Sequence, residues 1–130
     1  MTGYELHDLL AANRELISDT WQYFLSVHLA IFGIVYIASG RIHLIERLVL
    51  IGAYLSFMFM NFNAQMDNYG NYVRIVNEIF ALPETAAGAA QAKAILKADP
   101  VWVADSLLHV YCAAAIVSSL IILLINRDRG

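Results

Sequence analysis

The chain has 130 residues, 60% of them hydrophobic, and its mean hydropathy of +0.61 is higher than expected for a soluble domain of this length. The net charge of −3 argues against nucleic acid as a partner, because binding to nucleic acid calls for a basic surface. The single cysteine, Cys112, excludes an intrachain disulfide framework and a metal site built from several thiolates.

The first element is predicted to be one long helix. Thr2, followed three residues later by Glu5, fits a capping box, in which two side chains satisfy free amides at a helix start. Residues 3–19 place leucines at helical spacing among charged residues, which indicates an amphipathic extension. Residues 20–39 carry no formal charge and match a hydrocarbon core of about 30 Å, so we predict the first transmembrane span there, ending at Gly40.

A short basic link, residues 41–47, is predicted to join the first span to the second span, residues 48–66. The second span begins as the apolar run LVLIGAYLSFMFM and passes without a proline into the amide-rich NFNAQMDNYGNY. We therefore expect its helix to continue out of the membrane until Pro83 breaks it. Residues 67–99 are predicted to be an extramembrane helical segment, in which the Ala-rich stretch 84–98 forms a surface or partner-facing helix.

The third span is predicted to cover residues 101–125, after Asp99 as helix cap and Pro100 at the first helical position. The sequence therefore predicts an all-α integral membrane protein with three transmembrane helices, forming a single membrane domain over residues 1–130. A long amphipathic extension precedes the first span, and an extramembrane helical segment separates the second span from the third.

The distribution of Lys and Arg predicts the orientation. Arginines are dense in the link 41–47 and in the last four residues, and basic residues are sparse elsewhere. We therefore expect the C-terminus in the cytoplasm and the N-terminus outside, in a bacterial inner membrane. Trp21 and Trp102 would then both lie at the outer interface, where aromatic residues are enriched. The opposite orientation remains an alternative.

Polar residues form a stripe along the second helix. They recur at helical spacing, several of them seven residues apart, and comprise Arg47, Tyr54, Asn61, Gln65, Asn68 and Tyr72. Amides that face hydrocarbon lack hydrogen-bond partners, so this stripe is predicted to face other protein. Two interpretations stay open: polar contacts between helices, each contributing about 0.6–2 kcal/mol, or the wall of a hydrated vestibule or ligand mouth.

The third helix carries a second polar stripe, formed by Asp105, His109, Cys112, Ser119 and Asn126. Asp105 and His109 are four residues apart, so the carboxylate can hold the imidazole. We expect His109 to lie at the depth of Asn61 and Gln65, near the outer face. Titratable groups at membrane depth are functional candidates because they are costly to place there, and the alternative interpretation is a structural Asp–His pair.

His28 lies near the middle of the first span. One interpretation is a neutral imidazole bonded to a neighbouring carbonyl or hydroxyl group. The alternatives are a proton or ion path, and axial ligation of haem b together with His109 or with a neighbouring subunit. Small residues on the opposite side, Ser26, Ala30 and Gly33, would allow another helix to approach closely.

No HExxH, GxSxG, Walker or CxxC pattern occurs in the sequence. The outline of an amphipathic N-terminal helix followed by three membrane helices resembles diacylglycerol kinase. The segment MNFNAQMDNY does not supply the glutamate-rich catalytic pattern of that family, so we assign no family on this outline. The sequence favours a protein that is not an enzyme and has no metal site.

These observations predict a non-catalytic small integral membrane subunit that acts through homo- or hetero-oligomeric assembly in a membrane complex. Its expected partners are the lipid bilayer and either copies of itself or a larger complex. The first alternative is a small oligomeric ion- or proton-conducting pore or transporter lined by the two polar stripes. The second alternative is a haem-binding redox subunit. The candidate intramembrane residues are His28, Asn61, Gln65, Asn68, Asp105 and His109.

Overall fold

The computed structural model describes the backbone of residues 2–38, 41–97 and 104–125 and the side chains of residues 2–38, 41–94 and 106–125. Throughout these residues the regular elements are helices. They are α1 (Gly3–Ile37), α2 (Leu44–Ala81), α3 (Ala89–Lys97) and α4 (Ala104–Leu124). In the described part of the chain, α1, α2 and α4 are long and apolar enough to cross a membrane.

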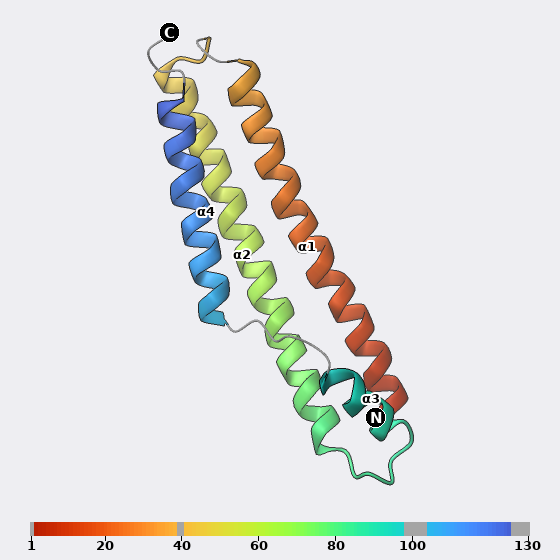
Figure 1. Cartoon of the computed structure of the whole chain (residues 1–130). Helices are drawn as coiled ribbons and strands as arrows, with labels where there is room; N and C mark the ends of the chain where they lie inside the picture. The colour runs from red at the N-terminus through yellow and green to blue at the C-terminus, as the bar shows by residue number, and fades with distance from the viewer. Residues whose placement is uncertain (1, 39–40, 98–103, 126–130) are drawn as a thin grey trace.

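The two longest helices form an antiparallel hairpin that runs the length of the molecule (Figure 1). Helix α4 packs beside the first half of α2 and runs in the same direction as α1. Helix α3 lies at the far end of the hairpin, near the N-terminus. The chain therefore has a three-helix half, built from α1, α2 and α4, and a second half in which α3 covers the ends of α1 and α2.

Side chains determine where both long helices begin. The predicted capping box of α1 is confirmed, because the Thr2 hydroxyl accepts the Glu5 amide at 3.2 Å and the Glu5 carboxylate accepts the Thr2 amide at 2.7 Å. Helix α2 begins at Leu44, so the predicted link 41–47 is too long. The Glu46 carboxylate accepts the free amide of His43 at 3.0 Å and stabilises a start one turn earlier.

The break between α2 and α3 is confirmed at Pro83, because α2 ends at Ala81. The helix predicted over residues 84–98 is shorter than expected and begins only at Ala89. Gly88 has a φ of +76°, a left-handed conformation that interrupts a helix and that glycine adopts without strain. The predicted start at Asp99 and Pro100, and Trp102, lie outside the described residues.

Each half of the molecule has its own buried cluster. In the three-helix half the buried residues come from α1, α2 and α4 and comprise Phe24, Ile31, Val35, Tyr54, Met58, Leu107, Tyr111 and Ile122. In the other half they come from α1, α2 and α3 and comprise Leu6, Leu10, Tyr72, Ile75, Ile79 and Ala92. Both long helices therefore bury residues along nearly their whole length.

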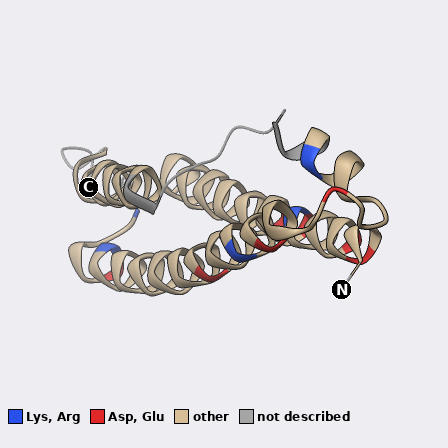
Figure 2. Ribbon diagram, turned by 90° about the horizontal axis from the view of Figure 1, so that it is seen from below, with Lys and Arg blue, Asp and Glu red and all other residues tan. Residues whose placement is uncertain are grey.

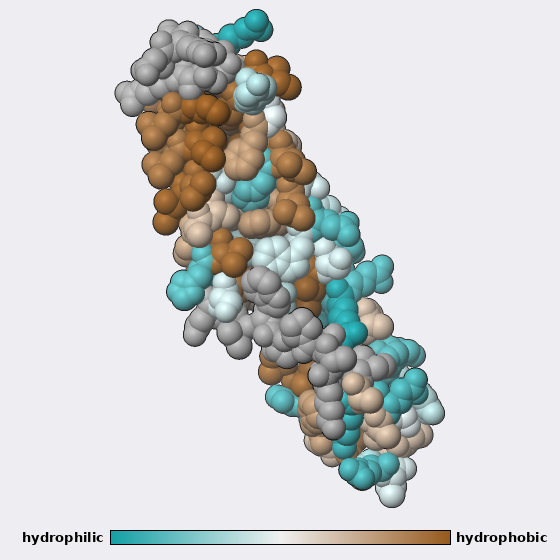
Figure 3. Space-filling view, viewed as in Figure 1, coloured by the Kyte–Doolittle hydropathy of each residue, from teal (hydrophilic) through white to brown (hydrophobic). Residues whose placement is uncertain are grey.

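The surfaces of the two halves differ. Large apolar side chains are exposed around the three-helix half, among them Leu29, Val49, Phe59 and Ile116, and Figure 3 shows this half as mainly brown. The half that holds α3 carries most of the teal, hydrophilic surface in that view. Charged residues also gather toward the end with the N-terminus and α3 (Figure 2). This contrast is expected when one half contacts lipid and the other contacts water.

Helix α3 docks through very small residues. The Gly3 amide donates to the carbonyl oxygen of Ala87 at 2.8 Å, and a Cβ atom on Gly3 would lie within 2.6 Å of the backbone of residues 87–89. Ala89 and Ala92 are fully buried in this contact. The alanines of α3 thus allow close backbone approach, a role that hydropathy alone did not indicate.

Candidate functional site: polar contacts between α1, α2 and α4

Arg47 caps the C-terminal end of α4. Its guanidinium donates from Nη1 to the carbonyl oxygens of Ile122 at 2.6 Å and Ile125 at 2.9 Å, and from Nε to Ile42 at 3.2 Å. Carbonyl groups in the last turn of a helix have no amide partner within the helix, and that end carries partial negative charge. The buried Arg47 therefore neutralises the end of α4. It faces protein, as predicted for the polar stripe of the second helix, although the sequence analysis also counted it in the basic link.

His28 is buried between α1, α2 and α4, with only 8% of its surface exposed. Its Nδ1 lies 2.6 Å from the carbonyl oxygen of Phe24, and its Nε2 lies 2.7 Å from the hydroxyl of Tyr54. The Tyr54 hydroxyl also lies 3.2 Å from the carbonyl oxygen of Ala114 on α4. This chain of three contacts links all three membrane-length helices at one level.

The His28 site satisfies either protonation state of the imidazole. A carbonyl oxygen only accepts, so Nδ1 carries a hydrogen and donates to Phe24. In the neutral imidazole, Nε2 accepts the Tyr54 hydroxyl; in the imidazolium, Nε2 donates to Tyr54, whose hydroxyl then donates to Ala114. Because both nitrogens already have protein partners, neither offers a free lone pair to a haem iron.

Asn61 joins α1, α2 and α4 about two turns along α2 from Tyr54, the partner of His28. Its side-chain nitrogen donates to the carbonyl oxygen of Thr20 at 3.2 Å, and its side-chain oxygen accepts the hydroxyl of Tyr111. The Tyr111 ring also packs on Trp21 and Phe62, with ring centroids 5.8 and 5.3 Å away. The amide at position 61 therefore forms a bond with each neighbouring helix.

Gln65 and Asn68 continue these contacts between α2 and α1. Gln65 is fully buried and donates to the carbonyl oxygen of Ile17 at 3.3 Å. The side-chain nitrogen of Asn68 donates to the hydroxyl of Thr20 at 3.1 Å. The main-chain carbonyl oxygen of Asn68 accepts a hydrogen bond from the side-chain amide of Asn13 at 3.0 Å. The α2 stripe thus bonds mainly to its own neighbouring helices, and the interpretation as contacts between helices fits this arrangement.

The stripe predicted on the third helix is not the face of α4 that packs against α2. The buried face of α4 comprises Leu107, Tyr111, Ser118 and Ile122, whereas His109 and Cys112 are exposed and Ser119 is half-buried. Asn126 and the side chain of Asp105 lie outside the described residues, so the Asp105–His109 pair remains a prediction. Within one chain, His109 faces away from Asn61 and Gln65, and the expectation that the three residues share one membrane depth stays a prediction.

Tyr111, Thr20 and Asn13 are contact residues that the sequence analysis missed. Tyr111 lies seven residues before Ser118, so a search for the second polar face of α4 would have found both. Helix α4 has two weakly polar faces, and hydropathy does not indicate which of them packs against α2. Thr20 and Asn13 are seven residues apart on α1, a spacing that matches the heptads of α2.

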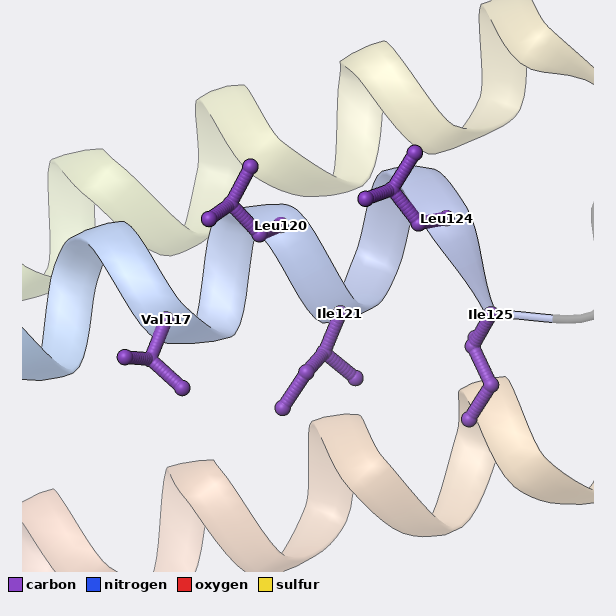
Figure 4. A pocket seen from close by; sticks show the side chains of 5 residues that line it. All are labelled: Val117, Leu120, Ile121, Leu124 and Ile125. Carbon is purple, nitrogen blue, oxygen red and sulfur yellow. The ribbon is translucent and has the colours of Figure 1, made fainter.

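An apolar groove lies on α4 toward α1, near the end capped by Arg47. It has a volume of about 380 Å³ and is lined by Val117, Leu120, Ile121, Leu124 and Ile125. Figure 4 shows Val117, Ile121 and Ile125 pointing from α4 toward α1. Its lining is aliphatic, so it suits a lipid chain and offers no polar path for an ion.

Among the described residues, no cluster of three or more His, Cys, Asp or Glu side chains could hold a metal ion. The three long apolar helices define the chain, by length and composition, as a multi-pass helical membrane protein. Comparisons with protein families, with curated proteins and with solved structures find no match to this chain.

Proposed function

We propose that the chain is a non-catalytic integral membrane subunit that acts through oligomeric assembly. The observation that carries this proposal is the position of polar side chains on the outer faces of α1 and α4. His109 and Cys112 are exposed on α4, and Asp19, Gln22 and Ser26 are exposed on α1. Polar groups inside a bilayer are stable when they meet other protein, and these groups face away from the rest of their own chain.

The depth of these groups follows from the packing. Arg47 binds the end of α4, so that end of the bundle marks one membrane boundary. About 20 residues from there span the hydrocarbon core, which places residues 17–37, 47–66 and 105–125 within it. Most of the polar residues on the outer faces of α1 and α4 then lie in the third of the bilayer nearest the surface opposite to the Arg47 end, and Asp19 lies near that surface.

The remaining parts of α1 and α2 project from the membrane together with α3. The projecting parts, residues 3–16 and 67–81, would extend about 20 Å beyond the core at 1.5 Å per residue. The buried cluster around Leu10 and Ile75 supports this, because it holds the two helices and α3 together without α4. We call this part the stalk and propose it as the extramembrane segment.

Charge supports an orientation with the stalk outside the cell and the C-terminus in the cytoplasm. Residues 41–47 and 126–130 hold four arginines in 12 residues, whereas 1–19 and 67–99 hold four Lys or Arg residues in 52, and the denser basic segments favour the cytoplasm. An impermeant thiol reagent tests this in intact cells. With Cys112→Ser as background, Thr85→Cys in the stalk should be labelled from outside and Arg41→Cys should not; the reverse pattern would overturn the orientation.

The pore and haem alternatives have less support. A pore lined by Asn61, Gln65 and His109 would need these side chains to converge, but the two amides bond to α1 and His109 faces away from them. A redox subunit would need free imidazole nitrogens, and both nitrogens of His28 are occupied. Assembly needs only the outer polar faces, which are available.

Native mass spectrometry in a mild detergent tests assembly. We expect species larger than the 14.5 kDa chain, and we expect His109→Leu to shift them toward smaller species. Asn63→Leu is the matched control, because Asn63 is an exposed amide on α2 that already donates to the Phe59 carbonyl of its own helix at 3.0 Å. A chain that stays monomeric in detergent and in lipid nanodiscs would refute the proposal.

A further inference from the structure

The contacts of His28 and Tyr54 indicate the register of α1 against α4. The chain from His28 through Tyr54 to Ala114 places residue 28 of α1 at the level of residue 114 of α4. Because α1 and α4 run in the same direction with the same rise per residue, their levels stay matched along both helices. Ser26 therefore lies level with Cys112, and Tyr23 lies level with His109.

Both helices carry polar groups on the side opposite to their buried face. On α1, Gln22 and Ser26 lie about 160–200° around the helix from Phe24, which is buried. With Asp19 and Tyr23 they line a shallow hollow. We call these four residues the α1 outer patch.

The equivalent side of α4 lies about 140–200° around the helix from Leu107, which is buried against α2. It carries His109 and Cys112, both exposed, and we call these two residues the α4 outer patch. The two patches lie at the same depth on opposite helices of one bundle. They are turned away from the core, so they cannot meet within one chain.

We infer that the partner in assembly is a second copy of this chain, with the α4 outer patch of one copy packed against the α1 outer patch of the next. This inference rests on the proposed function of assembly. Copies related by rotation about the membrane normal keep every residue at its own depth, so only groups at equal depth can meet. The two patches satisfy that condition.

The chemistry of the two patches is complementary. His109 would face Tyr23 and Gln22, which offer a hydroxyl and an amide as both donors and acceptors. Asp19 lies one helical turn further toward the stalk and offers a carboxylate that can accept a hydrogen bond from the imidazole of His109.

The deeper part of the same contact suits close packing. Ser26 and Ala30 on α1 are small and exposed, as are Cys112 and Ala113 on α4. Small residues let membrane helices approach closely, and close approach is the main attraction between helices in lipid. The contact therefore combines polar pairing near the outer boundary with close packing deeper in the membrane.

The contact joins two different surfaces, so it is heterologous. Each copy that uses its α4 patch leaves its α1 patch free for another copy. The assembly therefore grows beyond a dimer into a ring or a row, whereas a contact of α4 with α4 would stop at two copies.

Disulfide crosslinking in native membranes tests this geometry with the cysteine that the chain already has. In Ser26→Cys, oxidation should join Cys112 of one copy to the new thiol of the next and produce a ladder of dimers, trimers and larger products. Ser56→Cys is the matched control, because Ser56 is exposed at the same level on α2 and its hydroxyl bonds only to Gly52 of its own helix. A disulfide needs Cα atoms within about 7 Å, so we expect at least about fivefold less crosslinking in the control.

Adding Cys112→Ser to Ser26→Cys should abolish the ladder, and the unaltered chain should give no crosslinked dimer. Equal crosslinking in Ser26→Cys and Ser56→Cys, or dimers through Cys112 alone, would overturn the inference. If native mass spectrometry still shows assembly in that case, the proposed function stands and only the partner or its face is wrong. A monomeric chain without crosslinks would refute both.

Discussion

The guanidinium of Arg47 donates to the carbonyl oxygen of Ile122 at 2.6 Å, across 75 residues of sequence. A residue in the first turn of α2 thus caps the last turn of α4, and a buried charge holds this end of the bundle together. Because Arg47 is buried and these carbonyl groups have no amide partner within α4, this contact should contribute strongly to the attachment of α4.

Arg47→Met should therefore reduce the free energy of unfolding by about 2–3 kcal/mol, since it removes charge-assisted hydrogen bonds and leaves carbonyl groups unpaired. Circular dichroism during SDS titration of detergent-solubilised protein measures this loss. Arg47→Lys keeps the charge but not the planar fork of donors, so it should recover part of the stability. Equal stability of the Met variant and the unaltered chain would show that α4 does not depend on this cap.

The bond between His28 and Tyr54 should appear as a coupling energy. In a double-mutant cycle of His28→Phe and Tyr54→Phe, we expect a coupling of about 0.6–1.7 kcal/mol, the range found for hydrogen bonds between membrane helices. Tyr36→Phe serves as control, because Tyr36 is exposed on α1 and should leave stability unchanged. Additive effects of the two substitutions would mean that the bond does not stabilise the bundle.

Gln65→Leu should destabilise the chain by about 0.6–2 kcal/mol without changing the number of copies in the proposed assembly. The amide is fully buried and bonds to α1, so its loss weakens the bundle and leaves the outer faces intact. Unfolding in SDS gives the first quantity and native mass spectrometry gives the second. Smaller assemblies with unchanged stability would instead place Gln65 at a contact between copies.

Gly3→Ala should detach α3 from the ends of α1 and α2 in the stalk. The added Cβ would lie 2.5–2.6 Å from backbone atoms of residues 87–89, so those atoms must move, at a cost of about 1–3 kcal/mol. Limited proteolysis at residues 82–88 should become faster. Gly70→Ala is the control, because nothing lies within 4 Å of its Cβ position and alanine favours the helix. Equal cleavage rates in both variants would contradict the close packing at Gly3.

Much of the fold could be predicted because its signals are local. Three apolar stretches of sufficient length, the capping box at Thr2 and the break at Pro83 each depend on nearby residues or on the thickness of the bilayer. The early start of α2 was not predicted, because the Glu46 carboxylate can accept the His43 amide only in one orientation of its side chain, which the sequence does not show.

The sequence by itself determined that three helices are long and apolar enough to cross a bilayer and that the heptads of α2, with Tyr54 and Asn61, form one polar stripe. Only the tertiary structure decided which polar groups meet: Tyr111 turns inward to Asn61 and His109 turns outward. The physical reason is that hydropathy gives the spacing of a face but not its direction. Direction depends on the rotation of α4 against α2, which buried side chains and the Arg47 cap determine together.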